Sequence, residues 1–362
     1  MKPLIVCIGL IAAFASGLAN AAEWTFGIPM NTPRGGLGAA VDQCGNIYAA
    51  GGQISWCPSE LTNTVEKFDG TLWSYVAPMS RTREEFPLVC IGDFLYAIGG
   101  KTGGMILATV ERYDITTDTW DATAVPDLNV ARVGSGAVAD SQGRVYVIGG
   151  VGLDEEGNPI ALPSVEVFDL ARPELGWTFG PPLNVPRRSA GVAIDHRGRI
   201  YAIGGGGLLE HLRTVERLDP CNPDAGWVIL EKLIPGLASN DDQAVTGADG
   251  RIYVAGGWLP GFTDRVLRFD PNNETWEEWI TLNTRRAELA LVLGKDGGIF
   301  AIGGASSGCP EALTSVEVLD TTPCVGDING DGVVDHLDLL EVVHNFGTCN
   351  SGPVQVSGEL QP

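Results

Sequence analysis

Six times in this chain, a Gly-Gly pair directly follows a short apolar segment such as the IYAA of residues 47–50. The second glycines of successive pairs are 48, 50, 55, 52 and 47 residues apart. A period near 50 residues is typical of arrays in which each unit is one small sheet that cannot bury its own faces alone. The sequence therefore predicts six similar units, whose second glycines are Gly52, Gly100, Gly150, Gly205, Gly257 and Gly304.

Each unit continues in the same way after its glycine pair. A segment close to Val-Glu-x-aromatic-Asp follows, as in residues 65–69, which read VEKFD. In every unit except the last a tryptophan then follows, at Trp73, Trp120, Trp177, Trp227 and Trp276. Short strands with alternating apolar residues, separated by Gly, Pro, Asn and Asp, indicate an all-β fold with four strands in each unit.

These motifs resemble the kelch β-propeller family over residues 23 to about 323. The resemblance implies an all-β, six-bladed propeller. The sixth unit lacks its tryptophan after Asp320, whereas Trp24 stands alone ahead of the first unit. We therefore predict that residues 23–27 supply the outermost strand of the sixth blade and close the ring, which leaves no long unpaired edge.

The N-terminus predicts export. Lys2 precedes an apolar run over residues 4–18, and the following Ala19-Asn20-Ala21 is typical of a signal-peptide cleavage site. We expect residues 1–21 to be a signal peptide, 22–323 the propeller, 324–350 a calcium-binding segment and 351–362 a flexible tail. The mature protein would be secreted, to the extracellular space, the cell surface or the periplasm.

The composition limits the possible partners. The formal net charge is −22, which opposes binding to nucleic acid or to anionic membranes and favours divalent cations. After the predicted signal peptide no apolar stretch reaches the length of a membrane span. We therefore expect no nucleic-acid partner and no membrane span.

Residues 327–338 read DINGDGVVDHLD, with oxygen-bearing side chains at positions 1, 3, 5, 9 and 12 and Gly332 at position 6. This is the pattern of an EF-hand-type calcium loop. Apolar residues at helical spacing over 337–346 then predict an amphipathic helix that ends near Gly347. The expected ligands of one Ca²⁺ are Asp327, Asn329, Asp331, the Val333 carbonyl, Asp335 and Asp338.

The segment 326–347 is similar to one repeat of a bacterial dockerin, because Asp338 at loop position 12 is followed by Leu-Leu. That resemblance implies calcium binding and a cohesin-like partner. Cohesin-binding dockerins carry two such repeats, however, and here no second repeat precedes Pro362. Whether the module binds a partner or only calcium is left open by the sequence.

Seven cysteines remain after removal of the predicted signal peptide. Cys324 and Cys349 bracket the calcium segment and are predicted to form a disulfide. Cys57 and Cys309 each lie five residues after a glycine pair, in blades that ring closure would make neighbours, so a second bond between them is a further hypothesis.

An arginine follows a Met or Leu by four residues at the start of the innermost strand in five of the six units. In the fifth unit Ser239 stands there, with Asp241 and Asp242 nearby. Because this start lies on the same face as the loop between the second and third strands, the arginines should ring one mouth of the central channel. They are Arg34, Arg83, Arg132, Arg187 and Arg286.

Two roles are open for these arginines. Each guanidinium could cap backbone carbonyls or pair with a carboxylate of a neighbouring blade. Alternatively, as the kelch resemblance implies, the five could bind a carboxylate-bearing peptide or carbohydrate on this face. The candidate partner carboxylates are Glu66, Glu111, Glu166, Glu216 and Glu317.

An enzymatic function is the alternative to this binding role. The copper radical oxidases of the kelch family need two Tyr and two His at one site. Here nearly all tyrosines occupy repeat positions. Two of the four histidines, His196 and His211, fall on opposite faces of the fourth unit, and the other two, His336 and His344, fall in the calcium segment, so no two are expected to converge on one site. A sialate mutarotase would need an arginine beside an acid, as in Arg83 with Glu84 or Glu85, or Arg286 with Glu288. The preferred hypothesis is a secreted, non-catalytic propeller that binds an unidentified protein or glycan.

Overall fold

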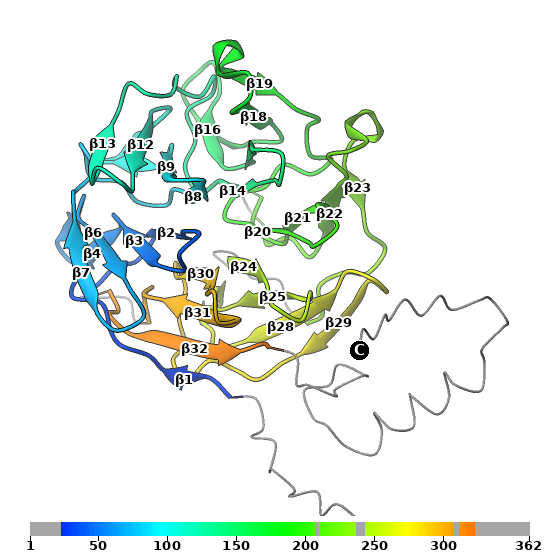
Figure 1. Ribbon diagram of the computed structural model, residues 1–362. Coiled ribbons are helices and arrows are strands. Elements are labelled where there is room, and N and C mark those ends of the chain that lie inside the picture. The colour runs from blue at the N-terminus through cyan, green and yellow to red at the C-terminus, as the bar shows by residue number, and fades with distance from the viewer. Residues whose placement is uncertain (1–22, 208–209, 237–242, 307–311, 323–362) are drawn as a thin grey trace, which may run out of the picture. The chain divides into compact units, whose positions relative to one another are not determined.

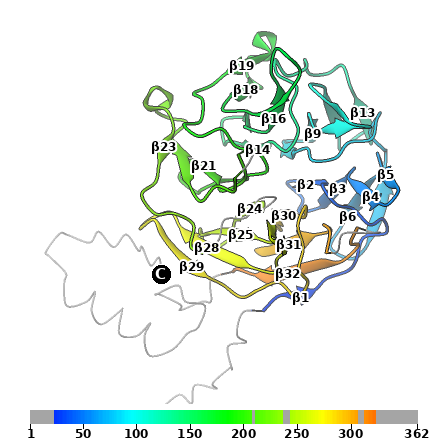
Figure 2. The same cartoon turned by 180° about the vertical axis from the view of Figure 1, so that it is seen from behind.

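The computed structural model describes residues 23–207, 210–236, 243–306 and 312–322. Residues 23–322 form one compact unit. Within it six four-stranded antiparallel sheets are arranged as blades around a central channel, as Figures 1 and 2 show from opposite sides. The prediction of an all-β, six-bladed propeller is confirmed.

In each blade the four strands lie side by side, from an innermost strand at the channel to an outermost strand at the edge of the ring. The innermost strands of blades one to six are β2 (Gly38–Val41), β8 (Leu88–Ile91), β14 (Gly136–Ala139), β20 (Gly191–Ile194), β24 (Gln243–Thr246) and β30 (Ala290–Leu293). The second strands are β3 (Ile47–Ala50), β9 (Phe94–Ile98), β15 (Arg144–Ile148), β21 (Ile200–Ile203), β25 (Ile252–Ala255) and β31 (Gly298–Ile302).

The third strands carry the acidic and aromatic pattern noted above. They are β6 (Val65–Phe68), β12 (Val110–Asp114), β18 (Val165–Asp169), β22 (Val215–Leu218), β28 (Val266–Asp270) and β32 (Val316–Asp320). The outermost strands are β7 (Trp73–Val76), β13 (Thr119–Asp121), β19 (Trp177–Phe179), β23 (Val228–Ile229), β29 (Thr275–Glu278) and β1 (Thr25–Phe26). Two short 3₁₀ helices, η1 (Pro173–Leu175) and η2 (Pro223–Ala225), precede β19 and β23.

The N-terminal strand closes the ring. Thr25 and Phe26 of β1 pair with Val318 and Glu317 of β32, so the first described residues complete the last blade. Trp24 is buried, and its indole N–H donates to the Ile280 carbonyl at 3.0 Å. The predicted place of residues 23–27 in the sixth blade is confirmed.

The core lies between the blades. Clusters of buried side chains join blade one to blade six and each of blades one to four to the next blade along the chain. In the cluster between blades one and six, for example, Leu37 and Trp73 belong to the same apolar group as Phe300 and Val316. Neither face of a blade would be buried without a neighbour, which is the physical reason for the repeat.

The glycine pairs are the joints between blades. The Gly52 N–H donates to the Arg83 carbonyl of the next blade at 2.7 Å, and a β-carbon on Gly51 would lie 2.7 Å from that same carbonyl oxygen. Both glycines have a positive φ, 60° and 91°, a region that favours glycine. Each pair thus lets the following blade approach closely, and any side chain would hold the blades apart.

Candidate functional site

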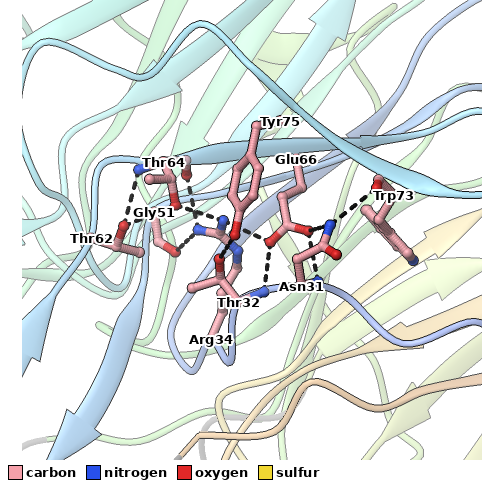
Figure 3. Close-up of polar contacts among 9 residues, drawn as sticks. All are labelled: Asn31, Thr32, Arg34, Gly51, Thr62, Thr64, Glu66, Trp73 and Tyr75. Carbon is pink, nitrogen blue, oxygen red and sulfur yellow. Dashed lines mark hydrogen bonds and ion pairs between the residues drawn. The ribbon is translucent and has the colours of Figure 1, made fainter.

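The five predicted arginines lie inside the blades. In blade one, Figure 3 shows Arg34 surrounded by backbone and side-chain acceptors. One guanidinium nitrogen, Nη1, donates to the Gly51 and Thr64 carbonyls at 2.8 and 2.9 Å. The other, Nη2, donates to Thr64 Oγ1 and to Glu66 Oε1. The guanidinium therefore ties the second strand of the blade to the third.

Glu66, on the third strand, is equally engaged. Its Oε2 accepts hydrogen bonds from the backbone and side-chain N–H groups of Asn31, both at 2.8 Å, and Oε1 accepts one from the Thr32 N–H (Figure 3). The Asn31 amide also donates to the Trp73 carbonyl on the outermost strand. One buried ion pair thus connects all four strands of the blade.

The same pairing occurs in four more blades. The shortest Arg Nη2 to Glu Oε1 distances are 3.1, 2.9, 2.7, 2.7 and 2.6 Å, and both side chains of each pair are 0% exposed. The pairs are Arg34–Glu66, Arg83–Glu111, Arg132–Glu166, Arg187–Glu216 and Arg286–Glu317. Burial lowers the pKa of each arginine from its ordinary value, and the adjacent glutamate opposes that shift.

This geometry corrects the ligand-binding role predicted for the five arginines. A guanidinium with no exposed surface and with both terminal nitrogens hydrogen-bonded inside its own blade cannot reach a ligand at the channel mouth. The pairing alternative describes what the structure contains, with the glutamate in the same blade rather than in a neighbouring one. The corrected residues are Arg34, Arg83, Arg132, Arg187 and Arg286.

The loops between the second and third strands do lie beside the starts of the innermost strands. Single β-bridges join Gly35 to Gln53, Glu84 to Lys101 and Val133 to Val151. Among the described residues, four of these loops form hairpins: β4 (Gln53–Trp56) with β5 (Ser59–Leu61), β10 (Lys101–Thr102) with β11 (Met105–Ile106), β16 (Val151–Leu153) with β17 (Pro159–Ala161), and β26 (Trp258–Leu259) with β27 (Gly261–Phe262). We call the surface formed by these hairpins and the adjoining channel mouth the hairpin face.

The hairpin face exposes large apolar side chains. Met105 is 64% exposed, Leu153 55% and Trp258 41%, and each belongs to a different hairpin. The Trp258 ring is held edge-on by Phe262, with 4.8 Å between ring centroids. Apolar groups displayed on separate loops of a rigid scaffold are typical of a protein-binding surface.

At the centre of this face the channel narrows to a cavity of about 140 Å³. A chain of backbone hydrogen bonds runs beside it from blade six through blades one, two and three to blade four: the Gly36 N–H donates to Glu288, Glu85 to Gly36, Gly134 to Glu85 and Ser189 to Gly134, each to the carbonyl. Each donor lies two residues after the arginine of its blade and has a positive φ between 47° and 61°. We call this chain the backbone belt.

Two of the belt residues bring carboxylates to the cavity. Glu85 and Glu288 line it, in positions where blades one and three have Gly36 and Gly134. The ammonium of Lys101 lies 2.6 Å from Glu85 Oε1 and 3.7 Å from Glu84 Oε1. Burial raises the pKa of Glu84, and Lys101 opposes that shift. Burial would lower the pKa of Lys101, but the carboxylates around it outweigh this and raise that pKa above its usual value.

Below the mouth the channel widens and becomes apolar. A space of about 770 Å³ is lined largely by the innermost strands, including Val41, Cys90, Val192 and Leu293. Leu88 lines both spaces, so the cavity and the wider channel are adjacent. Charged side chains return at the far rim, with Asp195 among them.

The residue pairs proposed for a mutarotase are not assembled as such a site. Arg83 and Arg286 bind Glu111 and Glu317 inside their blades, whereas Glu85 binds Lys101 and Glu288 lines the cavity. The role of Lys101 and the cavity were not predicted from the sequence. A signal for them was available, because Glu85 and Glu288 stand where two other repeats have glycine.

Other predictions lie partly or wholly outside the described residues. The proposed calcium ligands, Asp327 to Asp338, and the Cys324–Cys349 bond lie outside them. Cys57 is disulfide-bonded, and its predicted partner Cys309 is also outside. Within the described part of the chain no three His, Cys, Asp or Glu side chains gather as a metal site. In that part no helix is long and apolar enough to cross a membrane.

Comparison with known proteins agrees with the fold. The kelch motif model matches residues 83–123 and 242–278. Kelch-like protein 35 of Mus musculus is 30% identical over 233 residues, which is 62% of this chain and 36% of that protein, and Beta-scruin of Limulus polyphemus is 27% identical over 244 residues, 65% of this chain and 26% of that protein. The chain thus spans about a third or less of the length of these relatives.

A solved structure titled "Structure of YjhT" is similar in fold alone. Its TM-score is 0.65 at 16% identity, and the similarity covers 80% of this chain and 95% of the other. The chain contains kelch repeats, and these repeats form a six-bladed β-propeller.

Proposed function

We propose that this kelch-repeat propeller is a non-catalytic binding module that holds a partner protein on its hairpin face. The observation that carries the proposal is the display of Met105, Leu153 and Trp258 on three separate hairpins around one cavity. The buried ion pairs and the backbone belt make the blades a rigid support for these hairpins, so little order is lost when a partner binds. The kelch-like relatives favour a binding role over a catalytic one.

A display experiment tests this proposal. A library of twelve-residue peptides is sorted on the full-length protein, and the selected peptides are measured against a variant with Met105, Leu153 and Trp258 all replaced by Ser. We expect the variant to lose at least about tenfold in affinity, because buried apolar side chains contribute about 1.5–3 kcal/mol each.

The control is a variant with Leu72, Leu175 and Phe179 replaced by Ser. These residues are comparably exposed but lie on or beside the outer strands. Selected peptides that bind both variants as tightly as the original protein would show that the hairpin face is not the binding surface.

We further propose that the propeller is exported, as its N-terminal segment suggests, and that residues 327–338 bind one Ca²⁺. The spacing of oxygen ligands from Asp327 to Asp338 supports calcium binding. Calorimetric titration of the full chain with Ca²⁺ should detect one site that Asp327→Ala with Asp331→Ala removes. Titration of a cohesin-like protein into the original chain and into the variant with Asp327→Ala and Asp331→Ala then tests whether this segment serves attachment. No heat of binding at millimolar Ca²⁺ would contradict the calcium assignment.

A further inference from the structure

The cavity at the centre of the hairpin face has an excess of negative charge. Among the described residues, the carboxylates of Glu84, Glu85 and Glu288 surround or line this region, and the Lys101 ammonium lies among them. The carboxylates are positioned by the backbone belt, since Glu85 and Glu288 are themselves belt residues. Their location is therefore fixed by the joints between blades rather than by a loose loop.

A buried hydroxyl at the same place lacks a partner. Ser135 lines the cavity and is 8% exposed, and its Oγ has no hydrogen-bond partner among the described residues. The corresponding positions in blades one, two and six are Leu37, Phe86 and Leu289, which need no such partner. A buried hydroxyl without a hydrogen bond costs about 1–3 kcal/mol, so a donor brought by a ligand would relieve that cost.

The surroundings favour an organic cation over a metal ion. Lys101 already donates to Glu85 at 2.6 Å, so an ammonium group fits beside this carboxylate. A hard divalent ion such as Ca²⁺ binds about six or more oxygen atoms, and Lys101 already pairs with one oxygen of Glu84 and one of Glu85. Below the cavity the channel wall is apolar, and an ion would lose its hydration there without compensation. A cation that enters from the hairpin face must therefore stop at the level of Glu85 and Glu288.

We propose that the channel mouth receives a lysine or arginine side chain of the partner protein, with its cation between Glu85 and Glu288. This inference rests on the proposed binding function of the hairpin face. The apolar hairpin tips Met105, Leu153 and Trp258 would contact the flanking residues of the partner, and the stem of the inserted side chain would pass between them. The ligand class is thus a basic segment flanked by apolar residues.

Two peptide libraries that differ only in their central residue test the proposal. One library has Lys at the centre and the other has Met, which is of similar length but uncharged. Both are sorted on the full-length protein. We expect tight binders from the Lys library, and we expect replacement of their central Lys by Met to weaken binding about tenfold or more, since hydrogen bonds to charged groups are strong.

Variants of the protein test the same contact between the peptide cation and the carboxylates of Glu85 and Glu288. Glu85→Gln with Glu288→Gln should weaken these peptides about tenfold. The matched control is Glu155→Gln with Glu156→Gln, two exposed acids in the loop of the β16–β17 hairpin, which should change affinity less than about twofold. Thermal unfolding of each variant shows whether it is folded.

A third variant separates a binding role from a structural one. Lys101→Met removes the internal cation that occupies Glu85 and should tighten binding of the Lys peptides about threefold or more, whereas damage to the fold would weaken it. Equal affinity of Lys and Met peptides, with binding still lost in the Met105, Leu153 and Trp258 variant, would overturn the cation contact and leave the binding function standing. Binders that ignore both sets of variants would overturn both proposals.

Discussion

Blade three and blade five differ in what occupies the same buried position of the third strand: an ion-paired glutamate in blade three and a leucine in blade five. In blade three the buried pair Arg132–Glu166 connects the strands, and Ser164 accepts a further bond from the arginine. In blade five the position of Glu166 is taken by Leu267, which is buried in an apolar cluster, and the position of Ser164 is taken by Arg265. The blade that lacks the glutamate is also the one whose sequence lacks the arginine, with Ser239 in its place.

This difference indicates that the arginine and the glutamate of the ion pair are either both present in a blade or both absent. Five blades keep both charges and one blade keeps neither. A buried charge without its partner is expensive, whereas an apolar replacement of the whole pair is often tolerated. Arg265 in blade five extends to the Pro235 carbonyl and to the exposed Glu278, so its charge remains near solvent.

The largest effect should follow from making one half of blade three resemble blade five. Glu166→Leu leaves Arg132 buried without its carboxylate and should lower the free energy of unfolding by about 3–5 kcal/mol. The reverse change, Leu267→Glu, should be comparably harmful because it buries a carboxylate without an arginine. Urea denaturation of both variants provides the measurement, and a loss below about 1 kcal/mol in either would break the comparison.

Completing the conversion should recover part of that loss. Arg132→Ser combined with Glu166→Leu removes both charges. The losses of unfolding free energy in the two single variants should therefore add up to about 2–3 kcal/mol more than the loss in the double variant. The three variants and the original protein form a double-mutant cycle measured by the same denaturation. Additive losses would mean that the two residues do not act as a pair.

Replacing arginine by lysine should lower the free energy of unfolding by a smaller amount, and by more in blade three than in blade five. Arg132 donates to Gly149, Ser164 and Glu166 at once, a pattern that a single ammonium cannot reproduce, so Arg132→Lys should cost about 2 kcal/mol. Arg265→Lys should cost less than about 1 kcal/mol, because Glu278 is exposed. Equal losses would show that burial of the guanidinium is not the deciding factor.

The smallest difference concerns the outermost strands. The Trp177 indole N–H donates to the Pro126 carbonyl at 2.9 Å, whereas the buried Trp276 indole N–H has no partner within the described residues. Trp177→Phe should therefore cost about 1 kcal/mol more than Trp276→Phe, since only the first breaks a hydrogen bond. Thermal unfolding of the two variants tests this, and a larger loss for Trp276 would contradict it.

Much of the fold was predictable from the sequence because its determinants are local and repeated. Gly51 and Gly52 are needed wherever one blade approaches the next, so they recur with every blade. Closure followed from the missing tryptophan after Asp320 and the unpaired Trp24. These signals depend on neighbours within one repeat or on simple counting.

The site was less predictable because it depends on contacts between residues that are distant in the sequence, both within one repeat and between repeats. The sequence placed Arg34 at the start of an innermost strand but could not show whether its side chain turns into the blade or toward the channel. The structure decides this through the Gly51 and Thr64 carbonyls, which are 17 and 30 residues away. The cavity likewise combines Glu85, Ser135 and Glu288 from three blades, and no pattern within one repeat brings these together.

Closure by β1 has a consequence for the order of events during synthesis. Thr25 pairs with Val318, so the first strand to be made waits for nearly the last. At a translation rate of about 5–20 residues per second, that wait is roughly 15–60 s. During this time blade one has no blade six beside it, and Leu37 and Trp73 lack the contacts that blade six later supplies. The waiting strand itself is two residues long, too short to serve as an extended template for pairing with other nascent chains.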